Sequence, residues 1–189
     1  MALSKLRSES IDLTDDFAFT GNVTGAGGGK VLQVQYTQYD STHTQAITAN
    51  TDTAITNLSV NITPIAANSI IKLEAFLFAE YGQANWTTNN VLFFLRGSTK
   101  LAGPVAGSRR VGIGFASTGY HTSDASTSPD SGQITWFDND HNTTSQITYH
   151  LAMSCIYAST LYVNRCVSDT DQNERERGVS FISATEIAG

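Results

Sequence analysis

Residues able to carry out catalysis are few in this sequence and lie far apart. Hydrolysis requires paired carboxylates, a nucleophile beside a base, or a metal ion, and none of these groupings occurs at a recognisable spacing. The spacing of the histidines also matches no ligand pattern: His43, His121, His141 and His150. We therefore predict that the protein is not an enzyme and that it uses no cofactor.

Two acidic stretches, residues 138–142 and 169–173, resemble the start of a calcium-binding loop because oxygen-bearing side chains occupy alternate positions. Neither stretch continues as such a loop, since its sixth position is not glycine and its twelfth is not glutamate. Aspartate and asparagine also favour turns, which explains both stretches without a metal ion. The sequence predicts no metal site, and calcium at either loop stays an open alternative.

Two aromatic residues stand among small polar neighbours, where a large ring usually packs on a partner or a sugar. They are Trp86, which follows Gln-Ala-Asn, and Tyr120, which follows Ser-Thr-Gly. We predict that Trp86 and Tyr120 are binding residues; the alternative is that each ring anchors its own loop. Trp136 lies in a short apolar strand pattern and is assigned to the core.

The charge of the chain limits its partners. A net charge of −6 and a pI near 5.0 argue against binding to nucleic acid or to an anionic membrane surface. No apolar run approaches the length of a membrane span, and residues 1–10 contain no apolar core of signal-peptide length. We expect no nucleic-acid partner, no membrane insertion and no secretion directed by a signal peptide.

The elements that must position these residues are strands. Only 15% of the residues are charged, and Ser and Thr make up roughly a quarter of the chain, a composition that suits strands and turns better than helices. Apolar and polar residues alternate with no helical periodicity between them. The predicted strands are residues 31–39, 58–62, 70–80, 91–96 with a return through 101, 111–115, 134–137, 147–155, 161–164 and 178–187. We predict an all-β protein, an antiparallel β-sandwich or jelly roll.

Two features of these strands bear on assembly and redox state. In the strand over 70–80, Phe76 and Phe78 fall opposite the apolar set, where a solvated sheet would carry Thr or Lys. We predict that Phe76 and Phe78 form a trimer interface; the alternative is that a long loop covers them. Cys155 falls on the core side of its strand, which predicts a buried free thiol, with a disulfide to Cys166 as the alternative.

Residues 1–29 differ from the rest of the chain. Their apolar residues are spaced in a polar background, and the segment closes in a glycine-rich joint at 25–29. So short a stretch cannot bury apolar side chains alone, so it packs on the body, intertwines with copies of itself, or docks on another protein. We divide the chain into an arm, residues 1–29, and a head, residues 30–189. The predicted docking residues of the arm are Leu3, Leu6, Phe17 and Phe19.

Several motifs resemble the terminal module of tail-fibre and other virion proteins of tailed phages, especially marine and cyanobacterial ones. They are the opening Gly-Lys-Val-Leu-Gln at 29–33, the segments 58–64, 69–73 and 91–97, and the closing segment 178–187, which ends in Glu186-Ile187. The resemblance covers about residues 21–189. It implies a homotrimeric jelly roll similar to tumour-necrosis-factor-like domains and to the globular heads of complement. Residues 17–25 are similar to the end of a fibre shaft.

The resemblance implies a structural protein of the virion, assembled in the cytoplasm of the host. On this interpretation the protein is a homotrimeric fibre or spike head that contributes to host adsorption, docks on other virion proteins through the arm, and binds a glycan or protein of the host surface. Because only a short arm precedes the head, a head fibre or a capsid decoration (cement) protein is the alternative. A polysaccharide-depolymerising spike and a cellular lectin are more distant alternatives.

Overall fold

The computed structural model describes residues 29–82, 89–105, 107–114 and 129–189. Within these ranges the chain forms ten β-strands and no helix. The strands are β1 (Val31–Tyr39), β2 (His43–Ile47), β3 (Thr53–Ile62), β4 (Ile70–Tyr81), β5 (Asn90–Arg96), β6 (Thr99–Leu101), β7 (Asp130–Asp138), β8 (Ile147–Cys155), β9 (Ser159–Val163) and β10 (Ser180–Ile187). Residues 1–28 of the predicted arm, residues 1–29, lie outside the described residues.

The strands pair as one long antiparallel hairpin. The first strand pairs with the last, and the pairs continue inward as β1–β10, β2–β9, β3–β8, β4–β7 and β5–β6. The tip of this hairpin is the turn at Gly97, whose positive φ of 59° suits a residue without a side chain. A hairpin of this kind, rolled up so that its strands also pair laterally, is a jelly roll. The predicted all-β antiparallel fold is therefore confirmed.

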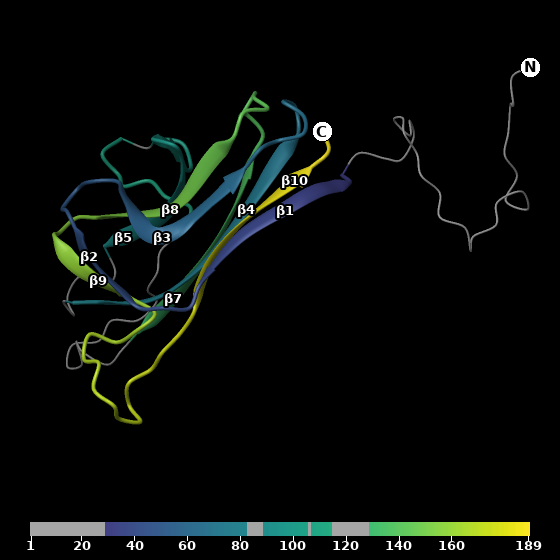
Figure 1. The fold of residues 1–189 in the computed structure, drawn as a ribbon. Helices are drawn as coiled ribbons and strands as arrows, with labels where there is room; N and C mark the ends of the chain where they lie inside the picture. Colours follow the sequence, from purple (N-terminus) through teal and green to yellow (C-terminus); the bar gives the residue numbers. More distant parts are fainter. Residues whose placement is uncertain (1–28, 83–88, 106, 115–128) are drawn as a thin grey trace, which may run out of the picture.

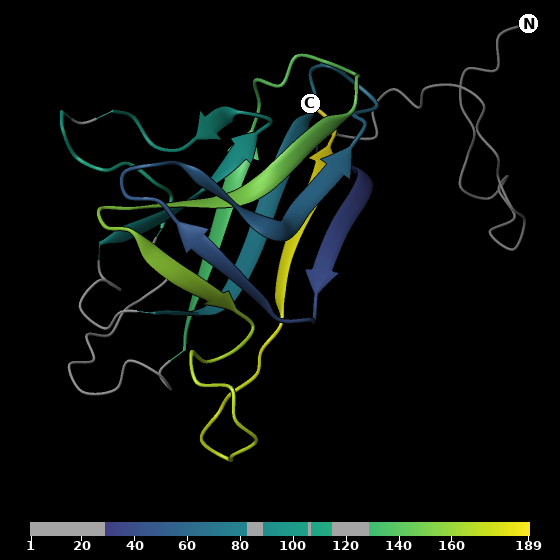
Figure 2. The same ribbon diagram turned by 60° about the vertical axis from the view of Figure 1, so that its left-hand side comes forward.

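Rolling the hairpin produces two sheets, which face each other as a sandwich (Figures 1 and 2). Sheet A has the order β1-β10-β4-β9-β2, with β7 paired to the other edge of β4, and sheet B has the order β3-β8-β5-β6. Along β4, β9 takes over from β10 on the same edge, because Phe76 pairs with Phe181 whereas Ala79 pairs with Val163. β4 is therefore the central strand of sheet A.

The core lies between the two sheets and follows the alternation of the sequence. On β4 the buried residues are Ile71, Leu73, Ala75 and Leu77, with half-buried residues between them. On β8 the inward residues Tyr149, Leu151 and Met153 are fully buried. Burial of such a side chain contributes about 1.5–3 kcal/mol, so these two strands supply much of the stability of the sandwich.

The structure departs from the predicted strands in four places. Strand β3 begins at Thr53, five residues before the predicted start at 58. β2 has no apolar alternation and was not predicted, because only Ile47 of its five residues is buried. Residues 111–114 form no strand; Gly114 makes a single bridge to Leu92, and Phe115 lies outside the described residues. Strand β7 begins at Asp130, four residues before its apolar part, because the pairing with β4 continues through polar residues.

Both cysteines are free and buried. The predicted buried thiol at Cys155 is thus confirmed, and Cys166 is buried as well. Burial raises the pKa of each thiol to about 11, so both are protonated at neutral pH. For Cys166 a hydrogen-bonding contact with Glu176 adds to this effect.

A buried carboxylate joins the first strand, the last strand and the turn between β3 and β4. The side chain of Glu186 is fully buried and accepts hydrogen bonds from Gln33 Nε2 at 2.6 Å, from the Ile65 backbone N–H at 2.8 Å and from the Ala66 backbone N–H at 3.2 Å. Gln33 and Glu186 come from the opening and closing motifs of the chain. These motifs therefore meet in one buried hydrogen-bonding group.

The same hydrogen bonds determine the titration of this carboxyl. Burial alone would raise the pKa of Glu186, but hydrogen bonds from Gln33, Ser69, Ile65 and Ala66 outweigh it and lower the pKa below its usual 4.5. A pKa that is lower in the folded than in the unfolded state gives stability that is present above pH 4.5. This stability is lost as the pH falls through the folded-state pKa.

We predict that Glu186→Ala lowers the free energy of unfolding by about 3 kcal/mol at pH 7, because it leaves buried backbone donors without an acceptor. Urea unfolding at one protein concentration measures this, with the exposed Glu174→Ala as the matched control, expected to change stability by less than about 0.5 kcal/mol. Below pH 4.5, the stability of the variant should also decline less steeply than that of the wild type, because the variant lacks this carboxyl. Equal stabilities of the two variants would contradict this role for Glu186.

Candidate interaction surfaces

The outer face of sheet A is defined here as the side chains of β1, β10, β4 and β7 that point away from sheet B. Residues directly opposite each other in an antiparallel sheet share a face, so the registers give its rows. One row runs Val34, Thr185, Lys72, Phe137, and the next runs Tyr36, Ser183, Glu74, Thr135. The apolar members of this face are Val31, Val34, Tyr36, Ile70, Phe76, Phe78, Phe137, Phe181 and Ile187.

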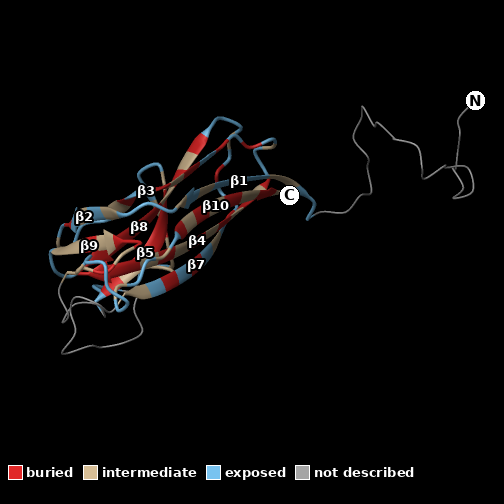
Figure 3. Cartoon of the chain, turned by 60° about the horizontal axis from the view of Figure 1, so that its bottom comes forward, coloured by how far each residue is buried: buried red, intermediate tan, exposed pale blue. Residues whose placement is uncertain are grey.

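Strand β1 is oriented with its apolar side toward solvent. Val34 is 53% exposed and Tyr36 is 72% exposed, whereas Gln33 and Gln35 alternate with them on the side of sheet B. At the other edge of the face, Phe137 of β7 is 55% exposed. The exposed residues of both edge strands can be followed in Figure 3. A strand of a soluble sandwich usually has the opposite orientation, so this face has the character of an interface.

The rings that the sequence singled out lie in the middle of the same face. Phe76 stacks on Phe181 of β10, with ring centroids 6.2 Å apart and planes inclined by 17°. The backbone at Gly178 lies against the Phe78 ring so closely that a Cβ atom there would overlap it. Phe76 and Phe78 are therefore half-buried within one chain. The most exposed rings of the face, Tyr36 and Phe137, were not assigned from the sequence.

The charged side chains of β4 on this face neutralise each other. Lys72 Nζ lies 3.0 Å from Glu74 Oε2, and both side chains are about one-third exposed. The remaining polar members of the two rows above are threonine and serine. Because Lys72 and Glu74 pair with each other, covering the two rows would bury no unpaired charge, and the pair itself would lose hydration. A second protein surface can therefore cover this face.

The other predicted site residues fall outside the described part of the chain. These are Trp86 and Tyr120 in the loops and Leu3, Leu6, Phe17 and Phe19 in the arm. The chain enters and leaves the segments with Trp86 and Tyr120 at one end of sheet A, since Tyr81 ends β4 there and Asp130 pairs with Ala79. The chain termini of the head lie at the opposite end, where Gly29 and Lys30 hydrogen-bond to Ala188.

The acidic stretch at 138–142 serves a structural role. Asp138 is buried, and its carboxylate lies 3.0 and 3.1 Å from Arg96 Nη1 and accepts a 2.7 Å hydrogen bond from the Tyr149 hydroxyl. Burial, followed by this hydrogen bond, raises the pKa of Tyr149 well above its usual value. Arg96 and Tyr149 belong to sheet B and Asp138 to sheet A, so this group connects the two sheets.

The second stretch and the buried histidine are likewise engaged within the chain. Asp169 pairs with Arg165 and with Arg177 across the loop between β9 and β10. His141 lies with Nε2 2.9 Å from the Ser69 carbonyl oxygen and Nδ1 3.1 Å from that of Thr143. Among the described residues, no three His, Cys, Asp or Glu side chains gather as a metal site, and no helix has the length and hydropathy of a membrane span.

Comparisons with known proteins add one structural similarity. No protein-family model matches the sequence, and no curated protein matches it. Among solved structures, the chain is similar to a chain in the structure of infectious bursal disease virus, Gx strain, at a TM-score of 0.32 and 12% sequence identity. The match covers 84% of this chain and 37% of that chain, so this chain spans little more than a third of its length. A similarity of this extent assigns no family.

We predict that Asp138→Ala lowers the free energy of unfolding by about 3 kcal/mol, because it leaves the Arg96 guanidinium and the Tyr149 hydroxyl without their acceptor. The neighbouring Asp140→Ala removes an exposed carboxylate and should cost less than about 1 kcal/mol. Urea unfolding of both variants measures the difference. Because the loss comes from an unpaired Arg96 charge, adding Arg96→Met to Asp138→Ala should restore part of the stability. A further loss of stability in this double variant would contradict the role of Asp138.

Proposed function

We propose that this protein is a structural protein of the virion surface of a tailed phage, the non-enzymatic head of a homotrimeric spike or fibre that contributes to host adsorption. The observation that carries the proposal is the orientation of β1, which places Val34 and Tyr36 outward while Gln33 binds the buried Glu186. A head that assembles with copies of itself buries these side chains.

The outer face of sheet A has the properties of a subunit interface. It is four strands wide, carries aromatic residues across its width, and contains the Lys72–Glu74 pair instead of unpaired charges in its two central rows. Interface cores are depleted in charge and enriched in aromatic residues. The three-fold stoichiometry comes from the resemblance to trimeric phage heads. A ring of three copies closes through a heterologous contact, in which one part of the surface packs on a different part of the next copy.

The polarity of the head supports a role in adsorption. The first strand starts beside the C-terminus, whereas the loop between β9 and β10 lies at the opposite end of the sandwich (Figure 1). If residues 1–29 dock on the virion, this opposite end points away from the particle. The segments with Trp86 and Tyr120 begin and end there, which makes them suitable for contact with a host.

We predict that Tyr36→Lys combined with Phe137→Lys converts a trimer into a monomer of 20.3 kDa at micromolar concentration, because three copies of two like charges would have to be buried. Multi-angle light scattering after gel filtration measures the mass. The matched control is Val105→Lys, which changes a residue that is 87% exposed outside the outer face and should leave the trimer intact. A monomeric wild type, or a double variant that stays trimeric, would contradict the proposal.

We further predict that purified protein slows phage adsorption to host cells, and that Trp86→Ala combined with Tyr120→Ala removes this competition. Loss of such an aromatic anchor typically costs about 2 kcal/mol or more, on the order of thirtyfold in affinity, and the trimer multiplies the loss. The melting temperature should fall by no more than a few degrees. A capsid cement protein predicts a different outcome: normal adsorption by particles that lack the protein, together with rupture of these particles on mild heating.

A further inference from the structure

The outside of sheet B is covered by the segment after β6. Phe93, Leu95 and Ala152 form a second apolar cluster on this side, and Ala102 and Ile113 of the covering segment pack on it. Three backbone hydrogen bonds attach the segment to β5. The Leu92 N–H donates to the Gly114 carbonyl at 2.6 Å, and the Leu92 carbonyl accepts from the N–H groups of Ile113 at 2.8 Å and Gly114 at 3.3 Å. The described part of the segment is therefore held in place on the sheet.

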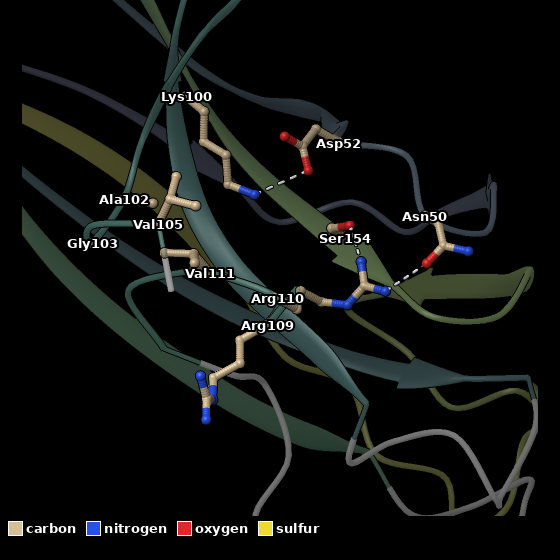
Figure 4. A pocket seen from close by; sticks show the side chains of 10 residues that line it. All are labelled: Asn50, Asp52, Lys100, Ala102, Gly103, Val105, Arg109, Arg110, Val111 and Ser154. Atoms are coloured by element: carbon tan, nitrogen blue, oxygen red, sulfur yellow. Dashed lines mark hydrogen bonds and ion pairs between the residues drawn. The ribbon is translucent and has the colours of Figure 1, made fainter. Parts of the chain in front are cut away.

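A cavity of about 380 Å³ lies between this segment, β6, the start of β3 and the end of β8 (Figure 4). Its polar lining comes from all four of these places: Asn50, Asp52, Lys100, Arg109, Arg110 and Ser154. Arg110 also lines a second cavity of about 290 Å³, together with Asn89, Asn90 and Ser108. Arg110 thus lines both cavities, and each has the volume for a group larger than a small ion.

The guanidinium of Arg110 is positioned by neutral acceptors. Its Nη1 donates to Ser154 Oγ at 2.6 Å and its Nη2 donates to Asn50 Oδ1 at 2.7 Å. Ser154 is buried, and Asn50 adopts a positive φ of 55° with its N–H donating to the Cys155 carbonyl at 2.8 Å. The acceptors of Arg110 therefore orient the guanidinium without neutralising its charge. The same positive charge lowers the pKa of the Cys155 thiol and so opposes part of the rise that burial causes.

The other charges of the cavity favour a monoanion. Lys100 pairs with Asp52 at 3.1 Å and lies over the Phe93 ring, 3.8 Å from its centroid, so its charge is already matched. In Figure 4, Lys100 and Arg110 reach toward the start of β3, where Asp52 and Asn50 lie, whereas Arg109 points away from them. The Asp52 carboxylate would repel a doubly charged phosphate, but it can accept hydrogen bonds from hydroxyl groups.

We propose that this groove binds an acidic polysaccharide through a sugar carboxylate on Arg110, with sugar hydroxyls on Asp52 and Asn50. Arginine binds a planar carboxylate through its fork of N–H donors, and the polar groups beside it match the hydroxyls of a uronic acid. The inference rests on the proposed function: it assumes that the head binds a host surface, and it names the class of ligand on that surface. It places a binding site on the outside of sheet B, apart from the subunit interface.

Isothermal titration of the purified full-length protein with tri-galacturonic acid tests the proposal. We expect binding that weakens as salt is raised, no binding of neutral maltotriose, and about tenfold weaker binding by Arg110→Gln. Arg175→Gln is the matched control, since it removes the same charge from the loop between β9 and β10 and should leave the affinity unchanged. Equal affinity for sodium sulfate or acetate would show an anion site without sugar recognition and would overturn the proposal.

A second variant tests the site through a gain. Asp52→Asn removes the carboxylate that pairs with Lys100 and leaves one more uncompensated positive charge in the cavity, while the amide oxygen can still accept a hydrogen bond from a sugar hydroxyl. It should therefore tighten binding of tri-galacturonic acid about threefold, a result that misfolding cannot produce. Unchanged or weaker binding by Asp52→Asn would mean that the sugar carboxylate does not bind in this cavity, and would contradict the proposal. Light scattering on the same samples separates the two proposals, because a protein that is trimeric but binds no uronic acid contradicts only this inference, and a monomer that binds it contradicts only the trimer.

Discussion

The hydrogen bonds of Glu186 determine the register on which the rest of the head depends. Because Gln33 donates to this buried carboxylate, the odd-numbered side of β1 faces sheet B from Gln33 onward, and the register shifts between Val31 and Gln33 to allow it. In a β-strand, a slip of one residue moves every side chain to the other face. The exposed position of Val34 and Tyr36 on β1 is therefore coupled to one buried carboxylate at the far end of β10.

Buried polar groups lie at both ends of the sandwich. At the end opposite Glu186, the Asn164 side chain donates to the Tyr39 and Ser41 carbonyls and accepts a hydrogen bond from Ser180 Oγ at 2.7 Å. The Ser180 hydroxyl in turn accepts from the Phe78 N–H at 3.0 Å. In the same row as Glu186, Asp138 lies opposite Ile71 and connects the sheets through Arg96 and Tyr149. Each group satisfies backbone or side-chain partners from several strands, which specifies how the sheets and their connecting loops fit together.

The sequence predicts the core well and the surfaces poorly, for physical reasons. Alternation over 70–80 and 147–155 reflects burial between two sheets, and the structure confirms it. The same alternation in β1 cannot reveal that its apolar side faces outward, because the deciding partner, Glu186, lies about 150 residues away. Phe76 and Phe78 were assigned to an interface because they interrupt a polar face, an assignment that stays a prediction, whereas Tyr36 and Phe137 look like ordinary strand residues. The groove at Arg110 combines Asn50, Lys100 and Ser154 from three distant segments, so no local pattern could indicate it.

The central claim is that the outer face of sheet A is the subunit interface. Photo-crosslinking tests it most directly, with a benzoylphenylalanine in place of Tyr36 and mass spectrometry of the cross-linked peptides. The account predicts covalent trimers, and cross-links from position 36 of one copy to residues of the outer face of another, such as those of β7 around Phe137. Cross-links confined to one chain, or reaching only residues outside this face, would contradict it.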